Sequence, residues 1–435
     1  MNRIVLIGNG FDLAHGLKTS YKNFIDDYWA NFLTNAQDNK QTKFTDDCFS
    51  FSTDFETLAH IISSDKMPVS FSELQEQIKT YKLSNVLRLR STVNLETKSK
   101  FMYRIINRLG LHNWVDVENE YYKNLKEIAT AIISPFDKYN IDSLNMEFDI
   151  IQRLLEDYLT KEEQKCIIES SIIKEINKKI LSPFSYRDIA FSKAISFANE
   201  IKEKITYFEE SSDKDLKVSY YKRRYPDIDI DCRDIEHFIK DYNKSDNKDI
   251  YLTKHIIRDT VPSYFMLPDD IIYINFNYTH TTNNYNVRDF EAIHIHGELN
   301  NKDNPIIFGY GDELAESYRG IENLNDNRYL KNIKSIRYNN TSNYRKIINF
   351  AESSSYQILT MGHSCGNSDR TLLNTLFEHK NCNSIKTYYH QINDSIDNYT
   401  DIIQNISRNF KDKILMRELV VNKEYSEPLL AYKER

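Results

Sequence analysis

The sequence predicts an α/β fold in which a parallel β-sheet is interrupted by a large α-helical insertion. The run Ile4–Ile7 is apolar and β-branched, as in a strand buried on both faces, and it leads directly into Gly8 and Gly10. All ten glycines except Gly110 lie within the first 16 residues or after residue 296. Strand-like runs reappear only in the last third of the chain. We therefore expect the two ends of the chain to form the sheet and the glycine-poor middle to be helical.

The first helix is expected to follow the glycine turn. Thr19 or Ser20 is a suitable N-cap, because each side-chain hydroxyl can accept a hydrogen bond from an N–H of the first turn. Apolar residues then recur at helical spacing, namely Tyr21, Phe24, Ile25, Tyr28, Trp29, Phe32 and Leu33. The polar stretch 35–44 is expected to be a loop.

The middle of the chain, from about Thr53 to Ile257, has predominantly helical spacing. The clearest amphipathic runs are 55–62, 74–81, 101–109, 114–133, 148–159, 166–180 and 190–208. The basic and aromatic run 217–224 is surrounded by acidic residues, so we interpret it as a solvated loop rather than as a nucleic-acid contact.

The C-terminal third alternates strands and helices. The expected strands are Ile271–Phe276, Ala292–His296, Ile306–Phe308, Gln357–Met361 and Ser384–Tyr389, and the expected helices are Leu372–Phe377 and Ile396–Ile406. This alternation is typical of a Rossmann-like open sheet, whose ligand lies beyond the carboxyl ends of the strands. We expect residues 1–45 and 261–435 to form that domain and residues 46–260 to form the helical insertion.

Composition excludes several classes of protein. The 435 residues are 40% hydrophobic and 28% charged, and no apolar run approaches the ~18 residues of a membrane span. The net charge of -7 argues against a surface that binds nucleic acid as a whole. Five scattered cysteines form no Cys-x-x-Cys pair, which predicts neither a zinc site nor a redox motif and favours a reducing compartment. We expect a cytoplasmic protein with no membrane partner.

Four polar clusters stand at the ends of predicted strands. They are Gly8–Asp12, Asn275–Thr279, His294–Gly297 and Gly362–Asp369. Glycines after a buried strand can bring bare N–H groups close to a phosphate, so the first cluster predicts a nucleotide. Leu13 stands where the third glycine of a dinucleotide fingerprint belongs, and an ordinary glycine turn is the alternative. We expect the four clusters to meet at one edge of the sheet.

The motifs resemble those of the bacterial AbiH family, which is associated with abortive infection by bacteriophage. The resemblance rests on the opening run Ile7–Tyr21 and continues to residue 369. Its further motifs are Trp114-x-Asp116-x-Glu118, Phe276-Asn277-Tyr278-Thr279, His294-Ile295-His296-Gly297-Glu298 and Gly362-His363-Ser364-x-Gly366-x-Ser368-Asp369. It implies a defence protein that acts against phage.

A more distant resemblance connects the same clusters with sirtuins. Gly8–Asp12 is similar to the sirtuin Gly-Ala-Gly-Ile-Ser loop, Asn277 to its asparagine, His296-Gly297 to its His-Gly and Gly362-His363-Ser364 to its Gly-Thr-Ser. This resemblance implies a sirtuin-like sheet that binds NAD, with hydrolysis of the nicotinamide–ribose bond as the implied reaction. The four-cysteine zinc module of deacetylating sirtuins is missing, which argues against deacetylation, and we expect no metal.

Cleavage of that bond needs a placed water or hydroxyl and a base that titrates near neutrality. We predict His296 as the base and Asn277 as the group that holds the water or the ribose hydroxyls. The predicted nucleotide-binding residues are Gly8, Asn9, Gly10, Phe11, Asp12, His15, Gly297, Gly362, His363, Ser364 and Asp369. Asp12 is assigned to the nicotinamide ribose or amide, and Ser364 and Asp369 to the adenosine ribose.

Several of these residues have an ordinary structural alternative. A buried histidine is usually satisfied by backbone groups, which applies to His294 and His296 alike. Asn277 can close an Asx turn, and Asp12 and Asp369 can cap helices. Glu118 is kept as a candidate that closes the cleft from the insertion, although helix-dipole stabilisation also explains it.

Two other functions remain open. A metal-dependent hydrolase of nucleotides or nucleic acid would use His294, His296, His15 or Asp12 as ligands, because a His-x-His pair on one strand face can hold a divalent ion. A nucleotide sensor would bind its ligand without turnover, while the insertion recruits a defence partner or self-associates. Cys365 has no base fixed by the sequence, so covalent catalysis is not favoured.

Overall fold

The computed structural model describes residues 1–38, 43–52, 94–112, 116–130, 139–285, 290–314 and 316–432. The helical runs expected at 55–62 and 74–81, and Trp114, lie outside these residues. The chain divides into two compact units. Unit 1 comprises Met1–Gly16, Ile167–Ile307 and Arg337–Arg435, and unit 2 comprises Leu17–Cys166 and Phe308–Ile336. The segment 46–260, expected as one insertion, is therefore shared between the two units.

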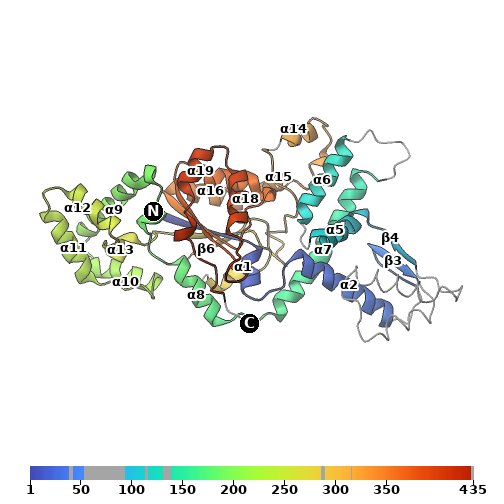
Figure 1. Cartoon of the computed structure of the whole chain (residues 1–435), viewed down its shortest axis with the longest axis horizontal. Coiled ribbons are helices and arrows are strands. Elements are labelled where there is room, and N and C mark those ends of the chain that lie inside the picture. Colours follow the sequence, from blue (N-terminus) through green and yellow to red (C-terminus); the bar gives the residue numbers. More distant parts are fainter. Residues whose placement is uncertain are drawn as a thin grey trace. The chain divides into compact units, whose positions relative to one another are not determined.

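Unit 1 contains a five-stranded sheet of order β6-β5-β1-β7-β8, and every pairing in it is parallel (Figure 1). Its strands are β1 (Asn2–Ile7), β5 (Ile271–Asn275), β6 (Glu291–His294), β7 (Tyr356–Met361) and β8 (Cys382–Tyr388). The α/β class and the parallel sheet built from both ends of the chain are thus confirmed.

The strand expected at Ile306–Phe308 is wrong. These residues are buried, but they form no strand, and the N–H of Ile307 donates to the carbonyl of His296 in a single irregular contact (2.7 Å). A run of three apolar residues after a proline is as consistent with a buried crossing segment as with a strand. This run lies where the chain passes from unit 1 to unit 2.

The carboxyl ends of the central strands are level with one another. Ile7 of β1 pairs with Asn275 of β5 on one side and with Met361 of β7 on the other. From β1 the sheet continues through β5 to β6 on one side, and β7 and β8 lie on the other. In open α/β sheets, a reversal of strand order of this kind is the usual place of ligand binding.

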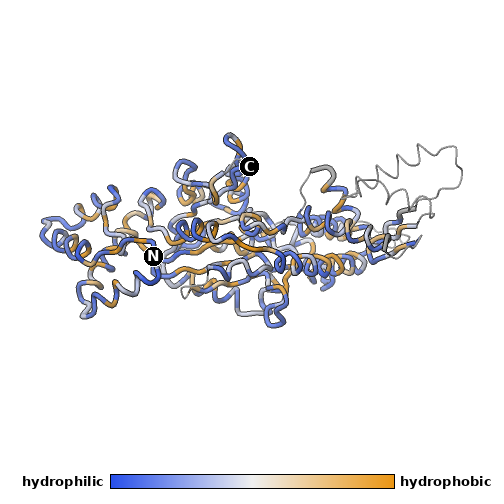
Figure 2. Tube along the Cα trace, turned by 90° about the horizontal axis from the view of Figure 1, so that it is seen from below, coloured by the Kyte–Doolittle hydropathy of each residue, from blue (hydrophilic) through white to orange (hydrophobic). Residues whose placement is uncertain are grey.

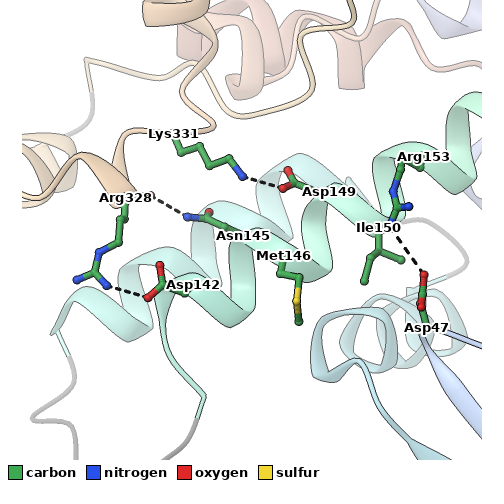
Figure 3. A pocket seen from close by; sticks show the side chains of 9 residues that line it. All are labelled: Asp47, Asp142, Asn145, Met146, Asp149, Ile150, Arg153, Arg328 and Lys331. Carbon is green, nitrogen blue, oxygen red and sulfur yellow. Dashed lines mark hydrogen bonds and ion pairs between the residues drawn. The ribbon is translucent and has the colours of Figure 1, made fainter.

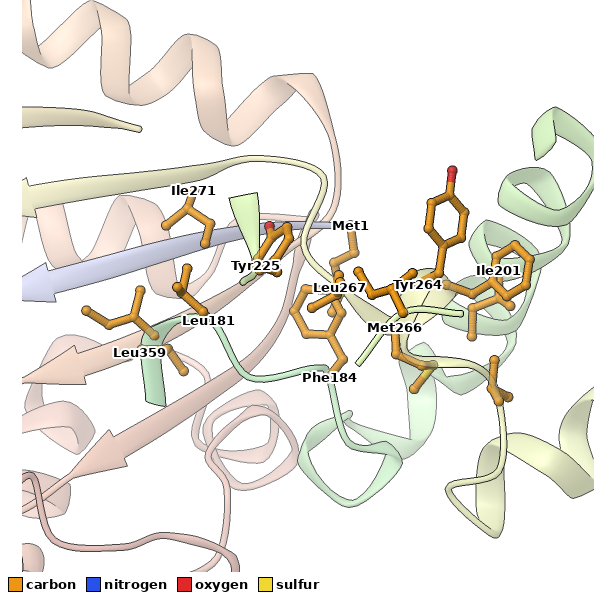
Figure 4. Packing of buried hydrophobic residues seen from close by; sticks show 14 of the residues in the cluster. Met1, Leu181, Phe184, Ile201, Tyr225, Tyr264, Met266, Leu267, Ile271 and Leu359 are labelled. Atoms are coloured by element: carbon orange, nitrogen blue, oxygen red, sulfur yellow. The ribbon is translucent and has the colours of Figure 1, made fainter. Parts of the chain in front are cut away.

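Helices cover both faces of the sheet. Ile4 and Leu6 of β1 pack in one hydrophobic cluster with α16 (Asn343–Ser353), α17 (Arg370–Phe377), α18 (Tyr399–Asn409) and α19 (Lys413–Leu419). Val5 and Ile7 belong to the opposite cluster with α8 (Ser170–Ile180), α9 (Ala194–Glu209), α11 (Cys232–Lys244), α12 (Lys248–Ile257) and α13 (Ser263–Met266). Figure 4 shows Ile271 and Leu359 of this second face beside Leu181 and Tyr225. Burial on both faces explains the continuous apolar runs Ile4–Ile7 of β1 and Ile271–Ile274 of β5.

The hydropathy of the chain follows this arrangement. In Figure 2 the coiled segments alternate between blue and orange, as amphipathic helices do. The run 217–224, expected as a loop, belongs to helix α10 (Lys214–Arg224). Arg224 is buried and bonds the Asp269 carbonyl (2.9 Å) and the Asp270 carboxylate (3.0 Å), so one of the basic residues in this run is structural.

Unit 2 is mainly helical and contains a small antiparallel sheet. Its elements include α2 (Tyr21–Asp38), β2 (Lys43–Thr45), β3 (Phe49–Ser52), β4 (Asn94–Thr97), α5 (Lys100–His112), α6 (Val117–Thr130), α7 (Ile141–Lys165) and α14 (Glu316–Glu322). The N–H of Asn23 donates to the Ser20 hydroxyl (3.1 Å), so the expected cap of α2 is confirmed. Lys43 and Phe44, expected in a loop, lie in β2. Within the described ranges, no helix is long and apolar enough to cross a bilayer.

Candidate functional site

Two glycine-containing loops meet at the carboxyl ends of β1 and β7. Gly8 follows β1 and precedes the short helix α1 (Asn9–Ala14), and Gly362 follows β7. The N–H of Gly10 donates to the carbonyl of Gly362 (2.8 Å), and the N–H of Gly8 donates to the carbonyl of Met361 (3.3 Å). Segments from the two ends of the sequence are thus joined backbone to backbone.

The two loops lie so close together that only glycine, which has no Cβ atom, fits at positions 8, 10 and 362. A Cβ atom on Gly362 would lie 2.0 Å from the Phe11 nitrogen, and Gly362 also has a positive φ of 72°. A Cβ on Gly10 would lie 2.9 Å from the Cα of Gly362, and one on Gly8 would lie 2.6 Å from the Cα of His363. The prediction that the N–H groups of Gly8 and Gly10 are left bare for a phosphate is wrong, because both donate to carbonyls of the β7 end.

Asn277 connects the loop after β5 to the loop after β1. Its Nδ2 donates to the carbonyl of Gly8 (3.0 Å), and its backbone N–H donates to Oδ1 of Asn275 (2.9 Å). The Asx turn expected as an alternative is therefore closed by Asn275 and not by Asn277. Asn277 is half-buried, whereas Asn9 and Ser364 are exposed at the same edge.

Asp12 and His15 hold α1 in place from inside the protein. Thr279 donates to Oδ2 of Asp12 (2.5 Å), and Asp12 lies within α1 rather than at its N-cap, which is Gly8. Nδ1 of His15 faces the Phe11 carbonyl (2.6 Å), while Nε2 faces the Tyr285 hydroxyl (2.6 Å). Burial lowers the pKa of His15 below its usual value, although the Phe11 carbonyl opposes that shift.

Asp369 lies between two histidines. Its Oδ1 is 3.1 Å from Nε2 of His296, and its Oδ2 is 3.4 Å from Nε2 of His363. All three side chains are at least nine-tenths buried. Nδ1 of His296 lies 3.2 Å from the carbonyl of Phe276. Asp369 therefore joins the loops that follow β6 and β7, and the loop after β5 contacts His296 through the Phe276 carbonyl.

The partners of each ring indicate where its protons lie. The N–H of Cys365 donates to Nδ1 of His363 (3.0 Å), so that nitrogen is the acceptor and Nε2 carries the proton. A carbonyl only accepts, so Nδ1 of His296 carries a proton toward Phe276. Nε2 of His296 also lies 3.3 Å from the Tyr338 hydroxyl. It is thus the nitrogen of His296 whose protonation can change.

The remaining predicted residues lie around His296, His363 and Asp369. Gly297 has a φ of 81°, and a Cβ there would lie 2.2 Å from the Pro305 carbonyl oxygen, so its glycine is a steric requirement. The ring of Phe276 stacks at an angle on His363, with centroids 4.1 Å apart. Phe11 is fully buried beside His15, so its side chain is part of the core. Ser364 presents an exposed side chain while its carbonyl accepts from Asn405 (2.8 Å).

Asn275 lies in one of the four predicted clusters, but the sequence did not indicate a role for its own side chain. Its buried amide accepts from the N–H of Asn277 and donates to the Thr279 carbonyl (3.3 Å). His294 is buried beside it, 3.3 Å from the same amide nitrogen. The available signal was the position of Asn275 as the last residue of a buried strand. Across the described residues, no group of three or more His, Cys, Asp or Glu side chains is arranged to hold a metal ion.

Glu118 is engaged within unit 2. Its Oε2 pairs with Nζ of the buried Lys334 (2.7 Å), and its Oε1 accepts from the N–H of Gly309 (3.3 Å). The stacked rings of Tyr122 and Tyr310, with centroids 4.0 Å apart, join the same two segments of unit 2. These contacts give Glu118 a structural role inside its own unit.

Unit 2 also contains an open cavity of about 660 Å³ along one face of α7 (Figure 3). Its carboxylates already have basic partners: Asp142 pairs with Arg328 (2.8 Å) and Asp149 with Lys331 (2.7 Å). Asp47 lies 3.8 Å from Arg153. Such exposed pairs offer little uncompensated charge to a ligand.

Comparison with known proteins identifies a family. The family model described as "Bacteriophage abortive infection AbiH" matches residues 4–391. The matched range includes residues 4–7 of β1, the two glycine loops, and the three side chains of His296, His363 and Asp369. No curated protein and no solved structure matches the chain.

Proposed function

Because this chain belongs to the AbiH family of bacteriophage abortive infection proteins, we propose that it acts in anti-phage defence by binding a nucleotide at the carboxyl edge of the unit 1 sheet. The proposed nucleotide is NAD, and the proposed reaction is hydrolysis of its nicotinamide–ribose bond. One observation carries the proposal: the loops after β1, β5, β6 and β7 come together at the reversal point of a parallel sheet, around His296. Open α/β sheets bind their ligands at such points.

The chemistry of His296 and its neighbours supports this reaction. The bond between the nicotinamide nitrogen and C1′ of the ribose breaks, and its electron pair leaves with nicotinamide. A water oxygen forms the new bond to C1′, and the proton of that water passes to Nε2 of His296. Nδ1 cannot serve, because it donates to the Phe276 carbonyl. The buried surroundings of His296 exclude bulk water from the reacting atoms.

Asn277 and the exposed residues complete the proposed site. Asn277 is placed by Gly8 and Asn275, so its amide has a fixed position beside the loops. Asn9 and Ser364 supply exposed polar groups at the same edge, suited to phosphate or ribose oxygens. The two glycine loops act here as a scaffold that positions these side chains, rather than as the donors themselves.

The experiment is incubation of the purified full-length protein with NAD, with nicotinamide release followed by chromatography. We expect release by the wild type and a loss of about 100-fold or more in His296→Ala, as for removal of a general base. Asn277→Ala should also reduce the rate. His379→Ala is the matched control, because His379 lies 3.2 Å from a carboxylate of Glu352 outside the four loops.

The outcomes separate hydrolysis from binding. Unchanged release by the Asn277→Ala/His296→Ala double variant would remove the proposed mechanism. If the wild type releases no nicotinamide, calorimetry with NAD distinguishes the remaining possibilities. Tight binding with NAD recovered intact would favour a nucleotide sensor. No binding would contradict the proposed ligand.

A further inference from the structure

We infer that Asp369 is a positioning residue that holds His296 and His363 in one defined arrangement of protons. The inference rests on the proposed function, which makes His296 the base. It assigns Asp369 a role different from the ribose contact expected for it from the sequence. Oδ1 faces Nε2 of His296 and Oδ2 faces Nε2 of His363, so each carboxylate oxygen is directed at an imidazole.

The protons on the two rings follow from what the Asp369 carboxylate can accept. An ionised carboxylate only accepts, so it is best satisfied when both facing nitrogens carry protons. His363 meets this requirement as a neutral ring, because Nδ1 accepts from Cys365 and its proton is therefore on Nε2. His296 already donates from Nδ1 to Phe276, so a second donated proton on Nε2 makes it an imidazolium.

Asp369 also affects the proposed proton transfer to His296. A base that removes a proton from water becomes an imidazolium, and its neighbours decide whether that state is stabilised. Asp369 provides an acceptor 3.1 Å from the nitrogen that receives the proton. When Nε2 is unprotonated, the Tyr338 hydroxyl at 3.3 Å can donate to it instead. His296 thus has a partner in each protonation state.

Asp369 is only 7% exposed, whereas Ser364 in the same loop is exposed. A carboxylate that contacts a ribose needs an oxygen directed at the ligand, whereas both oxygens of Asp369 are directed at histidines. His363 then serves to orient Asp369, and its own orientation is fixed by Cys365.

Substitution of Asp369 by asparagine tests the assignment without a change in size. An amide offers one acceptor and one donor, so it cannot accept from both rings. His363 still donates from Nε2, so the amide oxygen of the asparagine must accept that proton. The NH₂ group of the asparagine then faces His296. Nε2 of His296 then becomes an acceptor, and the ring is held neutral.

Steady-state kinetics gives the first readout. In Asp369→Asn we expect kcat for nicotinamide release to fall about 100-fold while KM for NAD changes less than about threefold, because the base is affected and the ligand contacts are not. Asp369→Glu keeps a carboxylate and should recover part of the rate. A KM at least about tenfold higher with little change in kcat would assign Asp369 to ligand contact and overturn the inference.

NMR of protein labelled with ¹⁵N-histidine gives a readout that does not depend on activity. Over a pH series we expect His296 to keep its Nε2 proton to a higher pH in the wild type than in Asp369→Asn, and Nε2 of His363 to carry its proton in both proteins. The signals are assigned with His296→Gln and His363→Gln. Nε2 of His363 without a proton, or loss of the Nε2 proton of His296 at the same pH in both proteins, would overturn the inference.

The two readouts fail separately. A wild type that neither binds nor cleaves NAD contradicts the proposed function, while the NMR pattern still decides whether Asp369 holds the two rings. If Asp369→Asn does not fold, the wild-type pH series alone is decisive: Nε2 of His363 should carry a proton throughout, and Nε2 of His296 should carry one only while that ring is an imidazolium.

Discussion

Gly10 and Gly362 are in direct backbone contact, with the Gly10 N–H donating to the Gly362 carbonyl at 2.8 Å. This contact joins the loop after the first strand to a loop near the end of the chain, and it places both beside His363 and Asn277. The glycines of the first motif are therefore explained by packing between two loops. A ligand at this edge would be recognised by the side chains that the packed loops present.

Gly362→Ala should destabilise unit 1 by about 3 kcal/mol or more, because it combines a positive φ with a Cβ that meets backbone atoms. Gly16→Ala is the matched variant: Gly16 has a φ of 90°, but a Cβ there would meet no atom within 4 Å, so only the conformational cost of about 1 kcal/mol applies. Urea unfolding measures both. Equal losses would contradict a steric requirement at Gly362.

The stability of unit 1 should fall as the pH drops below about 6.5, because unfolded His15 takes up a proton there, whereas the buried ring has a lowered pKa and does not. His15 does not change the unfolding free energy above this pH, because its ring is neutral in both the folded and the unfolded protein. Between the pKa of folded His15 and that of unfolded His15, the unfolding free energy should fall by about 1.4 kcal/mol for each pH unit. His15→Gln should reduce the slope of unfolding free energy against pH in this range. An unaltered slope in His15→Gln would refute this account.

The buried pair of Glu118 and Lys334 should be sensitive to removal of one partner. Glu118→Gln leaves Lys334 without its carboxylate and should destabilise unit 2 by about 3–5 kcal/mol. Asp142→Asn breaks the exposed pair with Arg328 and should cost no more than about 1 kcal/mol. Denaturant titration of Glu118→Gln, Lys334→Met, the double variant and Asp142→Asn measures the coupling, and losses in the double variant equal to the sum of its two singles would argue against a direct pair.

Most of the sheet could be predicted from the sequence because its strands are buried on both faces. Ile4–Ile7, Ile271–Phe276 and Gln357–Met361 are nearly continuous apolar runs, and such runs are informative when glycine or asparagine follows. Ile306–Phe308 has the same composition but is only a buried crossing segment. Three residues are too few for the pattern to distinguish the two.

The site could be predicted as a set of loops, but not as a set of contacts. His296 and Asn277 were identifiable from their positions after strands, since carboxyl ends of parallel strands share one edge. The bridge from Asp369 to both histidines was not, because it depends on the rotamers of side chains from two separate loops. The donor roles of Gly8 and Gly10 were mispredicted for a related reason: sequence spacing does not reveal that a distant carbonyl already accepts their protons.

The central claim is that a nucleotide binds where the four loops converge, and photo-cross-linking tests it most directly. The full-length protein is irradiated with an azido-adenine analogue of NAD, and labelled peptides are identified by mass spectrometry with unmodified NAD as competitor. We predict labelling within Gly8–Asp12, Asn275–Thr279, His294–Gly297 or Gly362–Asp369 that competitor abolishes. Competed labelling confined to unit 2, or no competed labelling at all, would contradict the account.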